Sequence, residues 1–124
     1  MERLRERRQY QAVGRGIRVA RPGLILQAAP QSAAGALPRF GFTVTKKTGG
    51  AVERNRIRRR LKEAVRLAAK AASPGVDYVV IGRRAALDRS FDALLADLAA
   101  GFAKAGERPA IMKRMSATTE QADG

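Results

Sequence analysis

The sequence predicts an α+β sandwich in which a small mixed β-sheet of about four strands packs against three helices. Apolar residues alternate with small or polar residues over 39–45, and they recur with a helical period over 51–72 and again over 91–102. The chain has 124 residues, a length typical of one domain. We place this domain at residues 1–105 and expect residues 106–124 to form a flexible tail, because they are polar and lack periodicity.

The first third of the chain is predicted to hold a helix followed by strands. Residues 3–13 fit a short basic helix that ends near Gly14. The stretch 17–29 predicts a buried strand whose apolar part follows a turn at residues 21–23. The uncharged segment 30–38 predicts a hairpin loop.

Residues 39–45 predict a strand with two different faces, because side chains alternate across a strand. The face expected in the core carries Phe40, Phe42 and Val44, and the opposite face carries Gly41, Thr43 and Thr45.

A basic turn at 46–50 leads into a predicted helix over residues 51–72, about 30 Å long at 1.5 Å per residue. Its buried stripe is expected to be Ile57, Leu61, Ala64, Val65, Ala68 and Ala72. The remaining sides of this helix are cationic.

The last third is predicted to hold one strand and one helix. A turn at 73–75 ends the basic helix, and residues 78–81 predict a central strand because they are apolar on both faces. Asp88 or Ser90 is expected to cap a final helix. Its apolar residues Phe91, Leu94, Leu95, Leu98 and Phe102 follow a helical period.

The charge of the chain is large and segregated. Lysine and arginine number 25 against 11 acidic residues, for a net charge of +14. Residues 1–21 carry a net +5 and residues 39–70 a net +9, whereas the rest is neutral overall. Such segregation favours two surfaces that bind a polyanion, although a solvated basic helix face is the simpler alternative.

Several function classes are excluded by composition. Without Cys or His, the chain cannot use thiol nucleophiles, serine-histidine catalysis, or zinc held by these ligands. No apolar run is long enough to span a membrane, and the charged N-terminus does not resemble a secretory signal. We therefore expect a cytoplasmic protein.

Five arginines crowd the first turns of the basic helix, at positions 54, 56, 58, 59 and 60. A cation near a helix N-terminus is disfavoured by about 0.3–1 kcal/mol at low salt. Such departures from local consistency are typical of functional sites. A polyphosphate would neutralise the arginines and accept hydrogen bonds from the exposed N–H groups of the helix start.

Residues 42–63, FTVTKKTGGAVERNRIRRRLKE, resemble the protein subunit of bacterial ribonuclease P. That family has a strand ending in a hydroxyl residue and Lys-Lys, a turn, and an Arg-Asn-Arg motif opening a long basic helix; Arg54-Asn55-Arg56 is that motif here. A weaker likeness extends over about residues 4–104.

The resemblance implies a ribonucleoprotein endonuclease whose RNA subunit performs catalysis, so no catalytic or metal-binding residue is expected in this chain. Mg²⁺ would be bound mainly by the RNA subunit and by substrate phosphates. The residues implied to bind the catalytic RNA subunit are Arg54, Asn55, Arg56, Arg58, Arg59, Arg60 and Lys62. Those implied to bind the 5′ leader of precursor tRNA are Tyr10, Thr43, Thr45, Lys46 and Lys47.

The resemblance also implies a left-handed crossover around the basic helix, as in the ribosomal protein S5 domain 2-like fold, against the usual handedness rule. Two positions depart from the family pattern. Gly50 replaces the usual Asn but is an acceptable N-cap, and Gly14 replaces a second aromatic residue near Tyr10, which would leave leader binding more dependent on charge.

Other functions remain open at this point. A ribosomal or other structured-RNA-binding protein would carry similar charge without any role in processing. A DNA-binding helix would need base-edge contacts from the arginines, and we expect no DNA partner. A membrane-surface role is disfavoured because the basic helix lacks aromatic anchors.

Overall fold

A computed structural model describes residues 2–31 and 36–111. Its five strands form one mixed sheet in the order β1-β4-β5-β3-β2. The strands are β1 (Glu2–Arg3), β2 (Ile17–Ala20), β3 (Leu24–Pro30), β4 (Arg39–Thr43) and β5 (Val76–Gly82). The helices are α1 (Arg7–Gly14), α2 (Ala51–Ala68) and α3 (Phe91–Gly106).

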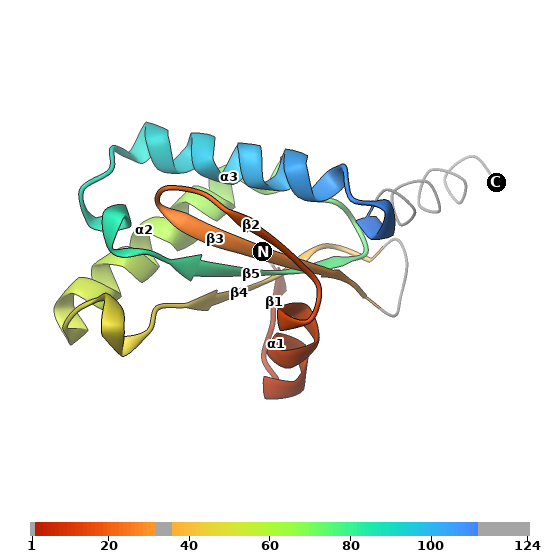
Figure 1. The fold of residues 1–124 in the computed structure, drawn as a ribbon, viewed down its shortest axis with the longest axis horizontal. Coiled ribbons are helices and arrows are strands. Elements are labelled where there is room, and N and C mark those ends of the chain that lie inside the picture. The colour runs from red at the N-terminus through yellow and green to blue at the C-terminus, as the bar shows by residue number, and fades with distance from the viewer. Residues whose placement is uncertain (1, 32–35, 112–124) are drawn as a thin grey trace.

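The sheet separates two unequal layers. Helices α2 and α3 pack together on one side, and α1 lies on the other (Figure 1). The α+β sandwich predicted from the sequence is therefore confirmed. Strands β4 and β5 are parallel neighbours joined by α2, which is the βαβ unit that the resemblance implies.

The predicted alternation of β4 is confirmed. Phe40, Phe42 and Val44 are buried in the main core, between the sheet and helices α2 and α3. Phe40 stacks on Tyr78 of β5 with ring centroids 5.6 Å apart, and Phe102 of α3 meets the Tyr78 ring edge-on at 5.0 Å.

The buried stripe of α2 also follows the sequence pattern. Ile57, Leu61, Ala64 and Val65 are fully buried. The regular helix ends earlier than predicted, at Ala68, and continues as a short 3-10 turn over Ala69–Ala71. Ser90 caps α3 as expected, because its hydroxyl accepts a hydrogen bond from the Ala93 N–H at 3.1 Å.

The N-terminal prediction is wrong in its first residues. Glu2 and Arg3 form a strand that pairs in parallel with β4, and the Leu4 N–H donates to the Phe40 carbonyl at 2.9 Å. The helix therefore begins only at Arg7. Sequence periodicity misses this strand because two residues are too few to show a period.

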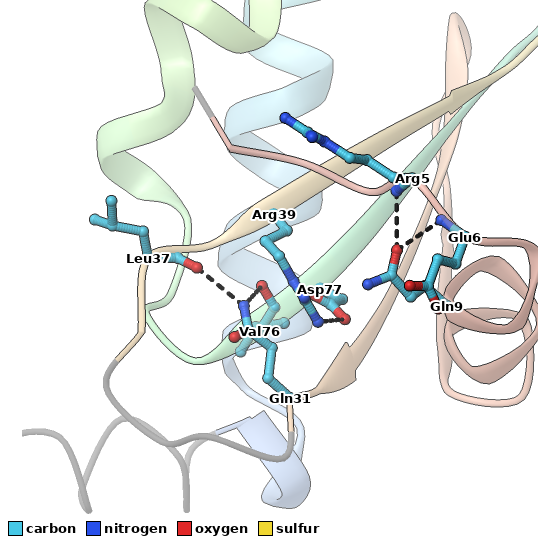
Figure 2. A network of polar contacts seen from close by, with 8 residues as sticks. All are labelled: Arg5, Glu6, Gln9, Gln31, Leu37, Arg39, Val76 and Asp77. Atoms are coloured by element: carbon cyan, nitrogen blue, oxygen red, sulfur yellow. Dashed lines mark hydrogen bonds and ion pairs between the residues drawn. The ribbon is translucent and has the colours of Figure 1, made fainter.

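The predicted hairpin loop at 30–38 is also wrong. Strands β3 and β4 are not paired, because β5 lies between them and pairs with both. The side-chain amide of Gln31 donates to the carbonyls of Leu37 and Val76 (Figure 2), and residues 32–35 of this segment lie outside the described part of the chain. The real hairpin is β2–β3, around the turn at 21–23.

The core extends beyond the predicted domain boundary at residue 105. Ile111 is fully buried in the main core, so the predicted tail is anchored at this residue, whereas residues 107–110 before it are exposed. Residues 112–124 lie outside the described part of the chain.

Asp97 of α3 is a buried acidic residue. Its carboxylate accepts a hydrogen bond from the Gly23 N–H at 3.0 Å and forms an ion pair with Arg89 at 2.9 Å. It thereby ties the β2–β3 turn to α3. None of the helices in the described ranges combines the length and the apolar character needed to cross a bilayer.

The buried Tyr78 ring makes stability sensitive to alkaline pH. Burial raises the pKa of Tyr78 above its ordinary value near 10, although the hydrogen bond from the Ser73 N–H offsets part of this. Above pH 10 the folded state retains a proton that the unfolded chain has lost, so the free energy of unfolding should fall as pH rises. In urea unfolding between pH 8 and 11, the free energy of unfolding should fall less steeply with pH for Tyr78→Phe than for the wild type. This variant should also have a free energy of unfolding lower by about 1–3 kcal/mol at all pH values, because the Ser73 N–H is left unpaired. Parallel curves for the two proteins would contradict this prediction.

Candidate nucleic-acid interface

The start of α2 is fixed by hydrogen bonds that involve Gly50, Glu53 and Arg84. Gly50 is the N-cap residue, and its N–H donates to the Glu53 carboxylate at 3.1 Å. Arg84 donates to the same carboxylate at 2.9 Å and to the Thr48 carbonyl at 2.9 Å. The hydrogen bond from Arg84, and then that from Gly50, hold the pKa of Glu53 below its ordinary value. The helix start thus has one acid of favourable sign.

One flank of α2 forms an open cationic groove of about 560 Å³, which we call the β4-side groove. Its lining residues are Val52, Asn55, Arg58, Arg59 and Lys62. The Asn55 Oδ1 accepts a hydrogen bond from the Arg58 guanidinium at 3.1 Å. Four of the seven residues predicted to bind the RNA subunit therefore meet in this groove.

The N-terminal strand brings a further cation to this groove. The Arg3 guanidinium lies 5.3 Å from the centroid of the Phe42 ring, and the Lys62 ammonium lies 6.0 Å from the same centroid. Burial, followed by the charges of Arg3 and Arg58, lowers the pKa of Lys62. Within the described ranges, none of these three cations forms an ion pair with a carboxylate. Such a group of uncompensated cations is suited to bind an anion.

The opposite flank of α2, the α3-side groove, is different in character. Arg56, Arg59, Arg60, Glu63 and Phe91 line this groove of about 430 Å³. The Arg60 guanidinium donates to three backbone carbonyls, those of Ala86, Leu87 and Arg89. Arg60 therefore holds α2 against the segment before α3, although the sequence predicted it among the RNA ligands. Glu63 is paired with Arg66.

Arg54 and Arg56, the two arginines of the Arg-Asn-Arg motif, lie in different environments. Arg56 is exposed, whereas Arg54 is half-buried. The Arg54 Nε is buried and finds no hydrogen-bond partner among the described residues. The two arginines of the motif therefore differ in exposure, and only Arg56 is exposed to solvent.

The predicted leader-binding residues lie on and beside the other face of the sheet. Tyr10 is half-buried, and its ring lies against Gly41 of β4. Thr43 follows two residues later on the same face of the strand and is half-exposed. Thr45 and the two lysines are exposed in the turn after β4, and the Thr45 and Thr48 hydroxyl oxygens are 3.4 Å apart.

An ion pair lies at the other end of the sheet face that carries Tyr10. Arg39 of β4 forms two hydrogen bonds to the carboxylate of Asp77 on β5, at 2.7 and 2.8 Å, beside the capped start of α1 (Figure 2). The hydrogen bond to Asp77 is the largest cause that raises the pKa of Arg39. Arg39 is therefore a neutralised cation, in contrast to those of the β4-side groove.

Sequence reasoning missed Arg3 and Gly41. Arg3 was counted only as part of the basic N-terminus, since its strand was not recognised. Gly41 had a detectable signal, because a glycine inside a strand often marks a close approach. Within the described ranges, no group of three or more acidic side chains could hold a metal ion.

Arg59 and Arg60 offer a direct test of the difference between an arginine that is free to bind RNA and one that fixes the fold. Arg60→Ala should lower the free energy of unfolding by about 1.5–3 kcal/mol, because it removes three charged hydrogen bonds to partly buried backbone carbonyls. Arg59→Ala, at an exposed position, should change it by less than about 0.5 kcal/mol while weakening RNA binding. Denaturant unfolding and filter binding measure the two effects. Equal stability of the two variants would show that the carbonyl contacts of Arg60 are not important.

Comparison with known proteins places these features in context. The Ribonuclease P family profile matches residues 1–106. The Ribonuclease P protein component of Paramagnetospirillum magneticum is 50% identical over 112 residues, which cover 86% of this chain and 84% of that protein. That of Gluconacetobacter diazotrophicus is 48% identical over 110 residues, covering 87% and 94%. The solved ribonuclease P protein of Staphylococcus aureus superimposes with a TM-score of 0.69 at 25% identity, over 85% of this chain and 95% of that one.

Proposed function

Because this chain belongs to the ribonuclease P protein family, we propose that its two sheet faces serve two different RNAs. The chain is the protein subunit of an RNA-based endoribonuclease that acts in tRNA processing. This membership decides against a structured-RNA-binding protein without a processing role. In our proposal, α2 binds the catalytic RNA subunit, and the face that carries Tyr10 binds the 5′ leader of precursor tRNA.

The assignment of α2 depends above all on the unpaired cations of the β4-side groove. Arg58, Lys62 and the neighbouring Arg3 lie together without a carboxylate partner among the described residues. Their mutual repulsion is relieved when a phosphate lies between them. Arginine also offers paired donors that match phosphate oxygens. We therefore add Arg3 to the RNA-binding set and assign Arg60 a structural role.

The leader assignment combines one aromatic ring with a basic turn. Tyr10 is partly exposed, and an unpaired base can stack on its ring. Thr43 and Thr45 offer hydroxyl groups along the same strand, and the following Lys46 and Lys47 are exposed and can contact backbone phosphates. This combination of stacking and charge suits a single strand rather than a duplex.

The described part of the chain has no group of three or more acidic side chains that could hold a metal ion by themselves. We propose that the RNA subunit and the substrate phosphates hold the Mg²⁺ ions that the reaction needs. The protein would contribute cations that screen phosphate repulsion between the two RNAs.

Cleavage of precursor tRNA at low Mg²⁺ tests this proposal. With the RNA subunit at about 2 mM Mg²⁺, adding the protein should increase the rate by about tenfold or more, because protein cations replace screening ions. Arg58→Ala with Lys62→Ala should lose most of this stimulation. Lys104→Ala with Arg108→Ala removes the same charge from exposed positions after and within α3 and should retain it.

The result that would refute the proposal is equally specific. If wild-type protein failed to stimulate cleavage, the processing role of this chain would be excluded. If the two double variants lost stimulation equally, net charge rather than the β4-side groove would be responsible.

A further inference from the structure

Strand β4 has a glycine, Gly41, at an interior position where glycine weakens a strand. Gly41 is in the interior of the strand, paired with Val79 of β5, and it is buried. Glycine weakens a strand because it has no side chain to pack and loses more backbone entropy. Among the described residues only Gly75 adopts the left-handed φ region, so the backbone of Gly41 has a conformation open to any residue. The reason for glycine must therefore be space.

That space is filled by Tyr10. A Cβ on Gly41 would lie 2.5 Å from the Tyr10 Cε1, 2.6 Å from its Cζ and 2.7 Å from its hydroxyl oxygen. All three distances are far below van der Waals contact. The outer half of the Tyr10 ring thus occupies the place that a side chain at position 41 would take.

The inner part of Tyr10 is held by a small cluster on the same side of the sheet. Leu4, Val13 and Val79 are its buried members, and Tyr10 packs against it together with Ala29 and Ile81. The ring is therefore supported from α1 and seated on β4, while the residue remains half-exposed. An aromatic ring fixed in this way loses little conformational freedom when a base stacks on it.

We propose that Gly41 is a positioning residue that seats the Tyr10 ring flush with the sheet, so that the ring serves as a fixed stacking platform for a leader base. This inference rests on the leader assignment made above. It gives Gly41 a part in recognising single-stranded RNA, although it has no side chain to offer the substrate.

A purely structural role for Gly41 predicts something different. If the glycine served only to let α1 pack on the sheet, a methyl group there would destabilise the fold. Tyr10, however, is a partly exposed side chain that can rotate about χ1 and χ2, so a methyl group at position 41 would displace the ring from its seat rather than force the backbone apart. Alanine also reduces the entropy of the unfolded chain relative to glycine. Gly41→Ala should therefore leave the unfolding midpoint unchanged or slightly raised while it displaces the ring.

The decisive experiment compares precursor tRNA with mature tRNA bound to the particle assembled from the RNA subunit and each protein variant. Tyr10→Ala should reduce the preference for precursor by about fivefold or more, the loss expected for one stacked base. Gly41→Ala should reduce it by a similar factor, and the double variant should be no worse than Tyr10→Ala alone. Affinity for the RNA subunit should not change in any of the three.

A matched control is available at Gly14, where no heavy atom lies within 4 Å of the position of an added Cβ. Gly14→Ala should keep the wild-type preference for precursor. It separates the effect of displacing Tyr10 from the general effect of replacing glycine by alanine.

Tyrosine fluorescence reports the ring position without any RNA. The chain has two tyrosines and no tryptophan, and Tyr78 is fully buried, so acrylamide quenching mainly reports Tyr10. Quenching should increase in Gly41→Ala and stay at the wild-type level in Gly14→Ala.

Three results would overturn the inference. The first is a wild-type preference for precursor in Gly41→Ala, whether or not quenching increases. The second is a double variant clearly worse than Tyr10→Ala, which would show that Gly41 acts independently of the ring. The third is a lowered midpoint in Gly41→Ala that persists in the double variant, where the clash no longer exists.

The leader assignment itself can fail separately. If Tyr10→Ala kept the full preference for precursor while the protein still stimulated cleavage, this face would not bind the leader. The proposed role of Gly41 would then fall with it, even if quenching showed that the glycine seats the ring.

Discussion

The structure depends on the burial of one helix face that is strong enough to hold a rod of like charges against a sheet. Ile57, Leu61 and Val65 are fully buried in the fold. Each such side chain contributes about 1.5–3 kcal/mol, whereas each cation near the helix start costs about 0.3–1 kcal/mol. Burial therefore outweighs repulsion, and α2 can present cations to a partner while remaining folded.

This balance explains why some of the arginines are used within the protein. Arg84 neutralises Glu53 at the helix start, and Arg60 donates to three carbonyls before α3. Both contacts join α2 to the segment between β5 and α3. In the β4-side groove, Arg58 and Lys62 have no acidic partner among the described residues. Some arginines of this region therefore fix the fold, while others remain available to bind a ligand.

The sequence was informative wherever structure follows a local period. The stripe of α2, the two faces of β4 and the Ser90 cap of α3 are all set by residues a few positions apart. Pairings between distant segments were not predictable in this way: β5 lies between β3 and β4, and the short β1 is recognisable only by its partner. The same limit applies to the site. Charge segregation located α2, but the burial of Asp97 and the carbonyl contacts of Arg60 depend on elements that meet only in the folded chain.

Strand β4 links the core to both proposed RNA surfaces, because its alternation assigns successive residues to opposite sides. Phe42 supports the main core and lies beneath the cations of Arg3 and Lys62, while its neighbours Gly41 and Thr43 belong to the face that carries Tyr10. A one-residue shift in the pairing of β4 with β5 would exchange these faces and destroy core, groove and platform together. The two-sided pairing of β5 and the ion pair between Arg39 and Asp77 oppose such a shift. In our proposal the register of a single strand therefore fixes where the protein meets each RNA, and a thin sheet can keep the two RNAs on opposite sides of one small domain.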